Sequence, residues 1–568
     1  MIRRILDSHL NFVFWLAVIF LIAFGCWRIC STYQVFGQVW DELFHIAAGM
    51  EWLDQGKYTH EICHPPLARV MGAAGLYLNG LRNMDRPEPG WDGWAEGDVL
   101  LHAGNKYERN LTLARIGILP FFVMASFVAA LWARNCAGTS AALLAVFLLT
   151  TLPPILAHAG FATLDMACAA FVTAALFCLS LWLAKPDLWH SLFLGITAGL
   201  AVLSKFSALA FFFIAGGLMG AIFILGSFQR RPAEKICPSR IRQRFSLALV
   251  ILLVCLLTIW AGYRFSAAPL STVYKKSGPT LRADGLSQEI PYSIQEKIYI
   301  PAPEFIQGIA DFYDVNKKGH LSYLLGNISV EGWWYFFPVI FLLKTPLPFI
   351  LLSAGGFFFI FRNIFLKTGG FPLSGLAVAV LGILGVGLLG RVDNGIRQIL
   401  SIYPLLAIVA GYGAAKLLSL NQPFRLVKAG LVVGLCLWQL TESLAAHPDY
   451  LAYFNELAGS HPEKIVVDSD LDWGQDFKRL TRTLKNRGIS EVVLSYNGSL
   501  GMDLEKFDLP QWQRLRPYQR ETGWIAISIF NLTLGTGEAP FDQFAWLREY
   551  PPVERIGKSI WLYHIVKE

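Results

Sequence analysis

The chain has 568 residues, of which 54% are hydrophobic and only 16% are charged, and its mean hydropathy is +0.46. A soluble protein of this size carries more charge, so the composition indicates a membrane protein with several spans. The formal net charge of +7 does not indicate nucleic-acid binding, because the basic residues cluster in short loops between apolar runs. That distribution is typical of loops that face the cytoplasm.

Apolar segments long enough to cross a bilayer recur along the chain. We expect about eleven membrane-spanning helices, near residues 11–31, 111–133, 140–158, 164–184, 188–203, 206–227, 245–263, 336–360, 371–390, 398–418 and 425–443. The first follows Arg3 and Arg4 and lacks a clear small-residue cleavage site, so we interpret it as a retained span. The predicted fold class is therefore an α-helical, multi-pass membrane protein.

Basic residues predict how these spans are oriented. The loop over residues 230–244 carries six Lys or Arg residues against the single acid Glu234, so it should face the cytoplasm. The N-terminus and the loops near Arg362 and Arg425 agree with the same alternation. An odd number of spans then places the C-terminal end outside the cell.

This orientation predicts two parts of the chain. Residues 1–445 should form a membrane domain whose outer loops are 32–110 and 264–335, and residues 446–568 should form an extracytoplasmic domain. Loops of that length usually carry structure of their own or a function.

The first outer loop should contain two short helices on the bilayer surface. Apolar residues from Leu43 to Leu53 recur at helical spacing, and Asp41 is placed to cap that helix. A second helix is expected from Pro66 to about Asn79. Such helices would lie along the membrane and not cross it.

The tail has the pattern of a small α/β domain. We expect strands at 464–469, 491–496, 524–530 and 559–566, and a helix at 475–487. About 120 residues are enough for a separate core.

Two adjacent acids, Asp41 and Glu42, follow the first span beside Trp40 and His45. Carboxylates at a membrane surface are costly to desolvate, which favours a chemical role. The alternative is that Asp41 only caps the helix and Glu42 is a solvated acid of its first turn. Asp165, at the expected outer start of the fourth span, favours the chemical role, because an ionisable group at the edge of a bundle usually faces a cavity.

Three cations are candidates for binding an anion. Lys205 interrupts an apolar stretch between two spans, Lys344 lies inside the eighth span, and Arg397 follows Asp393-Asn394-Gly395 at an outer turn. Extension of the side chain toward the interface can explain Arg397 but not Lys344. A lipid phosphate would provide the anion that such a cation requires.

Two apparent metal motifs are rejected. His60-Glu61-Ile62-Cys63-His64 matches the H-E-x-x-H pattern, but Pro65-Pro66 follows at once, and the motif requires a continuous helix. We interpret His64 as a fixed loop residue near Asp41. The segment 468–474 resembles a calcium loop, but its glycine is one place late and Arg479 replaces the final glutamate. We expect that segment to cap the helix after Gly474.

The ordered set of features resembles the protein O-mannosyltransferase and aminoarabinose transferase superfamily, whose members are membrane glycosyltransferases of the C-type fold. The resemblance consists of the acidic pair, Trp52, 56–58, His64-Pro65-Pro66-Leu67, Asp165, 199–205, 332–338, 341–346, 395–397, Tyr403-Pro404 and 471–476. No sugar-binding repeat domain of the kind inserted in eukaryotic protein mannosyltransferases is recognisable in the outer loops.

The resemblance implies a polyprenyl-phosphate sugar donor and transfer with inversion at the anomeric carbon. It implies that Asp41 is the base and that Glu42 and Asp165 orient the acceptor or the sugar. The candidates for binding the departing phosphate are Lys205, Lys344 and Arg397. The candidates for binding the sugar are His64 and His320. No metal ligand is assigned, and a divalent metal cofactor is not required by these residues but stays open.

The sugar is expected to be mannose-like, and the acceptor stays open among proteins, glycans and envelope lipids. The expected location is a bacterial inner membrane, with the active site and tail on the periplasmic or extracellular side. Two other interpretations stay open. One is a transporter or flippase for an anionic lipid-linked sugar, and the other is a structural or sensory membrane protein whose tail binds a ligand.

Overall fold

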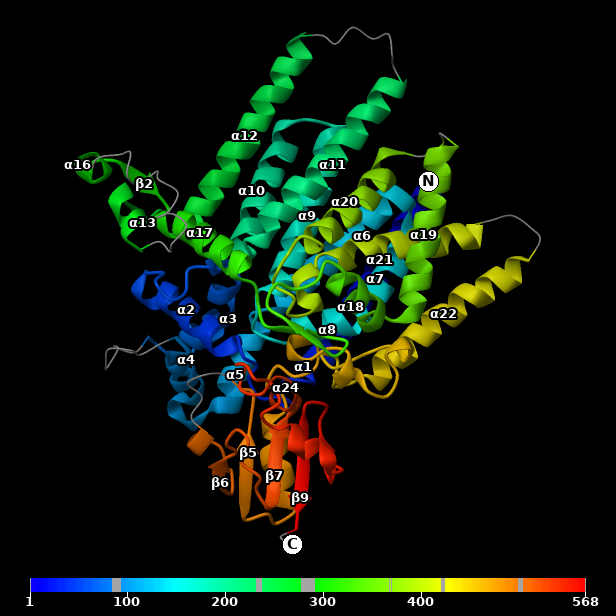
Figure 1. Cartoon of the computed structure of the whole chain (residues 1–568). Coiled ribbons are helices and arrows are strands. Elements are labelled where there is room, and N and C mark those ends of the chain that lie inside the picture. Colours follow the sequence, from blue (N-terminus) through cyan, green and yellow to red (C-terminus); the bar gives the residue numbers. More distant parts are fainter. Residues whose placement is uncertain are drawn as a thin grey trace.

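The computed structural model describes residues 2–83, 93–230, 238–276, 292–366, 368, 370–419, 424–498 and 504–566. Long helices form one end of the molecule and a small sheet domain forms the other (Figure 1). The N-terminal helix begins on the side of the bundle that faces away from the sheet domain. The predicted fold class, a helical membrane protein with a small C-terminal α/β domain, is confirmed.

The helical bundle follows the predicted apolar segments closely. Its helices are α1 (Ile2–Cys30), α5 (Tyr107–Ile116), α6 (Leu119–Ala137), α7 (Thr139–Thr150), α8 (Pro153–Ala159), α9 (Asp165–Ala184), α10 (Leu188–Ser204), α11 (Ser207–Arg230), α12 (Pro238–Gly262), α18 (Phe336–Lys344), α19 (Leu347–Phe365), α20 (Phe371–Gly387), α21 (Ile402–Ser419) and α22 (Arg425–Ala445). Within the described residues, eight helices are long and apolar enough to cross a membrane, or nine if the bent pair α7–α8 counts as one span. The apolar helices α10 and α20 are shorter than this length, and eleven spans stay a prediction.

Two predicted spans are broken by proline. α7 and α8 meet at an angle of 63° at Leu152, which precedes Pro153-Pro154. The predicted span 336–360 is two helices, because Thr345 precedes Pro346 and is extended (ψ 131°). A residue before proline avoids the helical region, so both breaks have the same cause. The second break leaves Lys344 at the last position of a half-helix.

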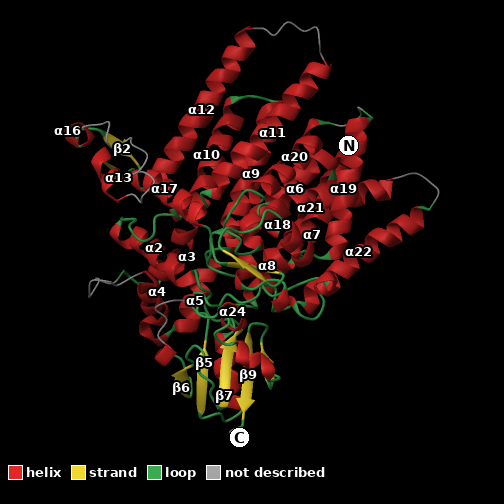
Figure 2. Ribbon diagram, viewed as in Figure 1, coloured by secondary structure: helices red, strands yellow, loops and turns green. Residues whose placement is uncertain are grey.

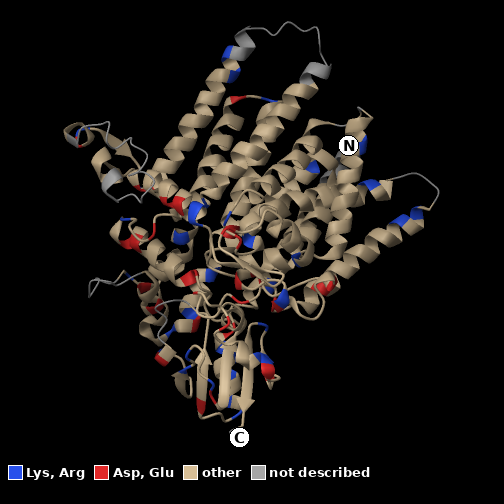
Figure 3. Ribbon diagram, in the orientation of Figure 1, with Lys and Arg blue, Asp and Glu red and all other residues tan. Residues whose placement is uncertain are grey.

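The charged side chains are sparse along the long helices and more frequent where the bundle meets the outer helices and the sheet domain (Figure 3). This pattern fits a bundle whose middle lies in lipid. Residues 231–237 and Lys367, which belong to the loops used to predict the orientation, lie outside the described residues.

The first outer loop forms a compact layer of helices, α2 (Glu42–Gln55), α3 (Pro66–Leu78) and α4 (Gly93–His102). Both predicted helices are present. However, α2 is buried at every position from Glu42 to Glu51, so it is covered on all sides and is not amphipathic. The covering is close, because a Cβ at Gly49 would overlap the carbonyl oxygen of Arg69 on α3.

The second outer loop, packed beside this layer, is described in part. Its elements are β1 (Ala267–Pro269), α13 (Leu270–Lys276), α16 (Tyr292–Gln295), β2 (Tyr299–Pro301), α17 (Pro303–Lys318), β3 (Ser322–Leu324) and β4 (Asn327–Ser329). β1 pairs with β2 and β3 with β4, both antiparallel.

The C-terminal sheet has the strand order β6-β5-β7-β9-β8 (Figure 2). Its elements are α23 (Phe477–Asn486), β5 (Glu491–Ser495), β6 (Gln511–Arg514), β7 (Gly523–Ser528), α24 (Ile529–Leu534), β8 (Glu554–Ile556) and β9 (Ile560–Ile565). β5 runs parallel to β6 and β7, whereas β9 is antiparallel to β7 and β8. Three of the four predicted strands and the predicted helix are present.

The predicted strand at 464–469 is wrong. Short 3₁₀ turns occupy Pro462–Lys464 and Asp468–Asp470 instead. The apolar run between them is buried between the bundle and the sheet domain, where Ile465 accepts a backbone hydrogen bond from Leu325. Burial, and not strand pairing, therefore explains its composition.

Candidate active site

A cavity of about 910 Å³ lies where the bundle, the outer helices and the sheet domain meet. Segments far apart in the sequence line it, including the start of α2, the start of α9, the turn between α10 and α11, the end of α17 and the short helix η2 (Ile396–Ile399). Six predicted site residues line this cavity: Asp41, His64, Asp165, Lys205, His320 and Arg397. The structure thus brings most of the predicted acids and cations to one place.

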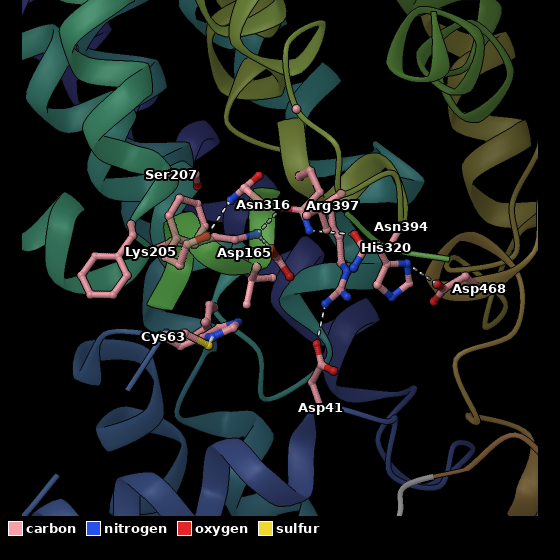
Figure 4. A pocket seen from close by; sticks show the side chains of 18 of the residues that line it. Asp41, Cys63, Asp165, Lys205, Ser207, Asn316, His320, Asn394, Arg397 and Asp468 are labelled. Carbon is pink, nitrogen blue, oxygen red and sulfur yellow. Dashed lines mark hydrogen bonds and ion pairs between the residues drawn. The ribbon is translucent and has the colours of Figure 1, made fainter. Parts of the chain in front are cut away.

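Asp41 stands at the N-cap position of α2, but its side chain does not cap the helix. Its Oδ2 instead accepts a hydrogen bond from Arg397 Nη1 at 2.5 Å (Figure 4). The predicted capping role is therefore wrong, and the carboxylate is directed into the cavity. The preceding segment is held by backbone hydrogen bonds from Gly37 to Gln475 (2.9 Å) and from Trp40 to Trp473 (3.0 Å).

Arg397 is held by stacking as well as by charge. Its guanidinium lies 4.3 Å from the ring centroid of Trp473, and its Nε has no hydrogen-bond partner among the described residues. Burial alone would lower the pKa of Arg397, but the carboxylates of Asp41 and Asp165 raise it overall. The residue therefore keeps its positive charge beside the cavity.

Lys205 and Asp165 form a second pair in the same cavity. Lys205 lies in the extended break between α10 and α11, and its Nζ is 2.8 Å from Asp165 Oδ1 and 2.8 Å from Gln398 Oε1. Asp165 is the first residue of α9, where a helix N-terminus favours a negative charge. Two carboxylate–cation pairs thus face one space.

A third, looser pair joins the outer loop to the sheet domain. His320 Nδ1 lies 3.8 Å from Asp468 Oδ2. Asp468 has a positive φ of 65°, a conformation that Asp and Asn tolerate better than most residues. Burial raises the pKa of Asp468, although His320 and Arg397 act in the opposite direction.

His45 also lines the cavity and is neutral. Arg69 Nε donates to His45 Nδ1 at 3.1 Å, so the ring proton must lie on Nε2. Burial, together with the charge of Arg69, lowers the pKa of His45 well below its ordinary value. The imidazole therefore offers an uncharged donor beside Asp41.

Glu42 does not line the cavity, so the predicted role in orienting substrate is corrected. Its side chain is fully buried, and both oxygens bind the Arg115 guanidinium, at 2.9 and 2.8 Å. The same carboxylate accepts backbone hydrogen bonds from Val39 and Ala162. Glu42 therefore joins α2, α5 and the turn before α9, which is a structural role.

Lys344 is likewise outside the cavity, and its predicted contact with a phosphate is corrected. Its Nζ is fully buried and donates to the carbonyl oxygens of Leu451 (2.5 Å) and Asp470 (2.6 Å). The Asp470 side chain in turn accepts the backbone N–H of Ile396 at 3.1 Å. Lys344 thus supports the loop that carries Arg397 and does not meet a ligand.

The segment 468–474 does not cap α23 as predicted. Asp476 stands at the N-cap position, but it accepts hydrogen bonds from Lys558 and Ser559. Ser469 Oγ donates to the carbonyl oxygen of Asn394, and a Cβ at Gly395 would overlap that hydroxyl. The tail segment thus holds the loop 393–397 in place, next to the cavity.

Residues of the rejected H-E-x-x-H pattern do meet, although without a helix. Ligand atoms of Glu61, Cys63 and His64 lie within 4.8 Å of one another. Arg69 Nη2 already binds Glu61 Oε2 at 2.7 Å, and its positive charge opposes a divalent cation there.

Comparison with known proteins shows which family and which fold the chain resembles. Residues 17–236 match the family model of dolichyl-phosphate-mannose-protein mannosyltransferases. The S. cerevisiae protein O-mannosyltransferase Pmt1-Pmt2 complex, solved with its sugar donor, is similar with a TM-score of 0.52 and 12% identity, over 77% of this chain and 90% of that one. The chain has the C-type glycosyltransferase fold, and its residues 17–236 are similar to the dolichyl-phosphate-mannose-protein mannosyltransferase family.

ArnT from Cupriavidus metallidurans, solved with undecaprenyl phosphate, shares 12% identity over 96% of this chain and 97% of that one, with a TM-score of 0.45. A search of curated protein sequences finds no significant match. The family match covers Asp41, His64, Asp165 and Lys205, whereas His320, Arg397 and the sheet domain lie beyond it.

Sequence reasoning missed several residues that line the cavity of this C-type fold. Gln398 binds Lys205, Asp468 faces His320, and Trp473 stacks on Arg397. The clearest available signal was the segment 468–474, where three acids and a tryptophan stand close together. This segment was predicted to cap a helix, so Asp468 and Trp473 were not recognised as residues that line the cavity.

Proposed function

We propose that this protein is an inverting membrane glycosyltransferase that moves a mannose-like sugar from a polyprenyl phosphate to an acceptor hydroxyl. The observation that carries the proposal is the meeting of two carboxylate–cation pairs, Asp41 with Arg397 and Asp165 with Lys205, in one cavity. The family match and the C-type fold support it.

Asp41 is assigned as the base. Its carboxylate takes the proton of the acceptor hydroxyl, whose oxygen attacks the anomeric carbon from the face opposite to the phosphate. The bond from that carbon to the phosphate oxygen breaks, and the electron pair leaves with the polyprenyl phosphate. Asp41 suits this role because it is one-fifth exposed to the cavity and its partner Arg397 is shared with the leaving group.

Lys205 and Arg397 are assigned to the departing phosphate. Each already holds a carboxylate, and the arriving phosphate takes over part of those contacts. Arg397 contributes its guanidinium, and Lys205 contributes its ammonium. Asp165 then orients Lys205 or the sugar, His64 lines the sugar pocket, and His320 borders that pocket from the second outer loop.

An apolar wall of the cavity suits the isoprenoid chain. It is formed by side chains of α11, α17, α20 and the turn that follows α20: Phe211, Ile214, Phe312, Val315, Val386 and Leu389. Leu389 is 81% exposed and Ile214 is 40% exposed, so the wall continues to the outer surface of the bundle. A lipid tail bound there stays in the membrane while its phosphate reaches Lys205.

We also propose how the chain is divided and oriented in the membrane. The membrane domain comprises residues 1–445, and the extracytoplasmic domain comprises residues 446–568. The cavity opens on the periplasmic or extracellular side of a bacterial inner membrane.

The test is transfer by the purified full-length protein. Labelled polyprenyl-phosphate mannose is incubated with protein, glycan and lipid acceptors, using the wild type, Asp41→Asn and the matched control Asp54→Asn. Asp54 lies on α2 outside the cavity and pairs with Arg82. Asp41→Asn should lower kcat by roughly 10²- to 10⁴-fold, the usual contribution of a general base, while Asp54→Asn transfers normally.

Equal transfer by the two variants would remove Asp41 as the base. If the protein instead moves the intact donor across the membrane of a vesicle without cleaving it, the interpretation as a flippase is favoured.

A further inference from the structure

The cavity has a polar arm as well as an apolar wall. The polar arm is lined by His320 from the second outer loop and by four residues of the C-terminal part: Asp468, Asn497, Phe530 and Asn531. In Figure 4, His320 and Asp468 lie on one side of Arg397, whereas Lys205 and Ser207 lie on the other. The space around Arg397 and Asp41 can therefore be reached from two sides, one along the apolar wall and the other along the polar arm.

We propose that the polar arm is the acceptor subsite and that it takes an uncharged carbohydrate. This inference rests on the proposed function, because it names the acceptor that meets Asp41. Since the apolar wall suits the donor lipid, the acceptor must approach from another side, and the polar arm leads to the same carboxylate.

The side chains of the polar arm suit a molecule with several hydroxyl groups. A carboxylate accepts hydrogen bonds at both oxygens, an amide both donates and accepts, and an imidazole does either. Ser495 Oγ accepts from Asn531 Nδ2 at 2.9 Å, which fixes the orientation of that amide. Asp468 is held in the same way, because Ser469 N–H donates to its Oδ1 at 2.6 Å and leaves Oδ2 toward His320. Preorganised polar groups lose little entropy on binding.

The charge of the polar arm disfavours an anionic acceptor. Asp468 contributes a negative charge at its centre, and a phosphate-bearing lipid headgroup would be repelled there. A sugar carries hydroxyl groups at several ring positions, which can pair with His320, Asp468 and Asn531 along the arm. Phe530 is partly exposed and adds an apolar surface against which the C–H face of a sugar ring can pack.

The test compares two probes with the full-length protein and a polyprenyl-phosphate sugar donor. One probe is a set of neutral methyl hexosides and disaccharides, and the other is a set of peptides containing serine and threonine. We expect transfer to the glycosides. Transfer to peptides with none to glycosides would overturn the inference.

The variant Asp468→Asn tests the subsite itself. Asparagine tolerates the positive φ of this position and keeps an oxygen for Ser469 N–H, so the fold should persist. The acceptor KM should rise about tenfold, as expected when a hydrogen bond to a charged group is weakened, and the donor KM should change much less. Asp508→Asn is the matched control, since Asp508 is exposed on the same domain and pairs with Lys485. An acceptor KM that moves no more in Asp468→Asn than in Asp508→Asn would contradict the assignment.

A binding measurement separates this inference from the proposed function. Without donor, a saturating methyl hexoside should raise the Tm of the wild type and of Asp508→Asn, but not that of Asp468→Asn. If the wild type does not cleave the donor, the proposed function is overturned. The change in Tm caused by the methyl hexoside would still show whether the subsite binds a carbohydrate. Equal shifts in all three proteins, or none in the wild type, would overturn the subsite.

Discussion

Asp41 and Glu42 are neighbours in the sequence, yet they belong to two different regions of the molecule. Asp41 faces the cavity and pairs with Arg397, and it is one-fifth exposed. Glu42 is fully buried, with Arg115 and two backbone N–H groups satisfying its oxygens. Successive helix residues point in different directions, so one step along α2 separates a group available for chemistry from a group used for assembly.

The cations divide in the same way. Lys205 and Arg397 bind carboxylates that themselves line the cavity, so a ligand can compete for them. Lys344 binds two backbone carbonyl oxygens in the protein interior, where a ligand cannot replace them. The partner of a buried charge, more than its position in a span, thus distinguishes a binding cation from a supporting one.

The largest expected effect compares Asp41→Ala with Glu42→Ala. Glu42→Ala leaves Arg115 as an unpaired buried charge and should cost about 3–5 kcal/mol of stability. Asp41→Ala leaves Arg397 with Asp165 as its remaining nearby carboxylate, so it should destabilise the protein less than Glu42→Ala does, while transfer is lost. Thermal unfolding of the purified variants and their kcat measure the two effects. A Glu42→Ala protein with normal Tm and no activity would place Glu42 in the chemistry.

The next effect concerns the donor phosphate. Lys205→Met alone would leave Asp165 buried and unpaired, so the double variant Lys205→Met/Asp165→Asn is the better test. It should retain a near-normal Tm, while the donor KM rises about 10- to 100-fold through loss of a charge-assisted hydrogen bond. An unchanged donor KM in the folded double variant would exclude Lys205 from the phosphate site.

Much of the membrane bundle could be predicted because its signal is local. An apolar run such as 164–184 must cross or fill a membrane whatever surrounds it, and α9 occupies Asp165–Ala184. The break at Thr345-Pro346 was a local signal that the predicted span 336–360 overlooked. The strand predicted at 464–469 failed because β-branched residues also suit a buried loop.

The candidate site was less predictable because its partners are distant in sequence. The residue type alone could not separate Asp41 from Glu42, since Arg397 and Arg115 decide their roles. Lys344 seemed to require a ligand only because the carbonyl oxygens of Leu451 and Asp470, in the tail, were not foreseen. The role of Asp468 likewise depends on His320, which lies in a different loop.

A smaller effect is expected for Lys344→Met. The substitution leaves two buried carbonyl oxygens without their donor and should cost about 1–3 kcal/mol. Because Lys344 supports Asp470 and, through it, the backbone at Ile396, kcat should fall slightly while donor KM changes less than in the Lys205 variant. Thermal unfolding together with donor titration tests this. A donor KM raised as strongly as in the Lys205 variant, with normal Tm, would restore Lys344 to the phosphate site.

The smallest expected effect is a pH dependence of acceptor binding. The subsite needs the ionised form of Asp468, and burial raises the pKa of that carboxyl above its ordinary value. Lowering the pH protonates Asp468 before an ordinary aspartate, whose pKa is about 4, so acceptor KM should rise as pH falls and begin to rise above that value. The rise should stay within about tenfold, the loss expected for one charge-assisted hydrogen bond. At saturating donor, the acceptor KM of Asp468→Asn should not change with pH, because its amide does not titrate. If the acceptor KM of this variant still follows the pH dependence of the wild type, another group titrates.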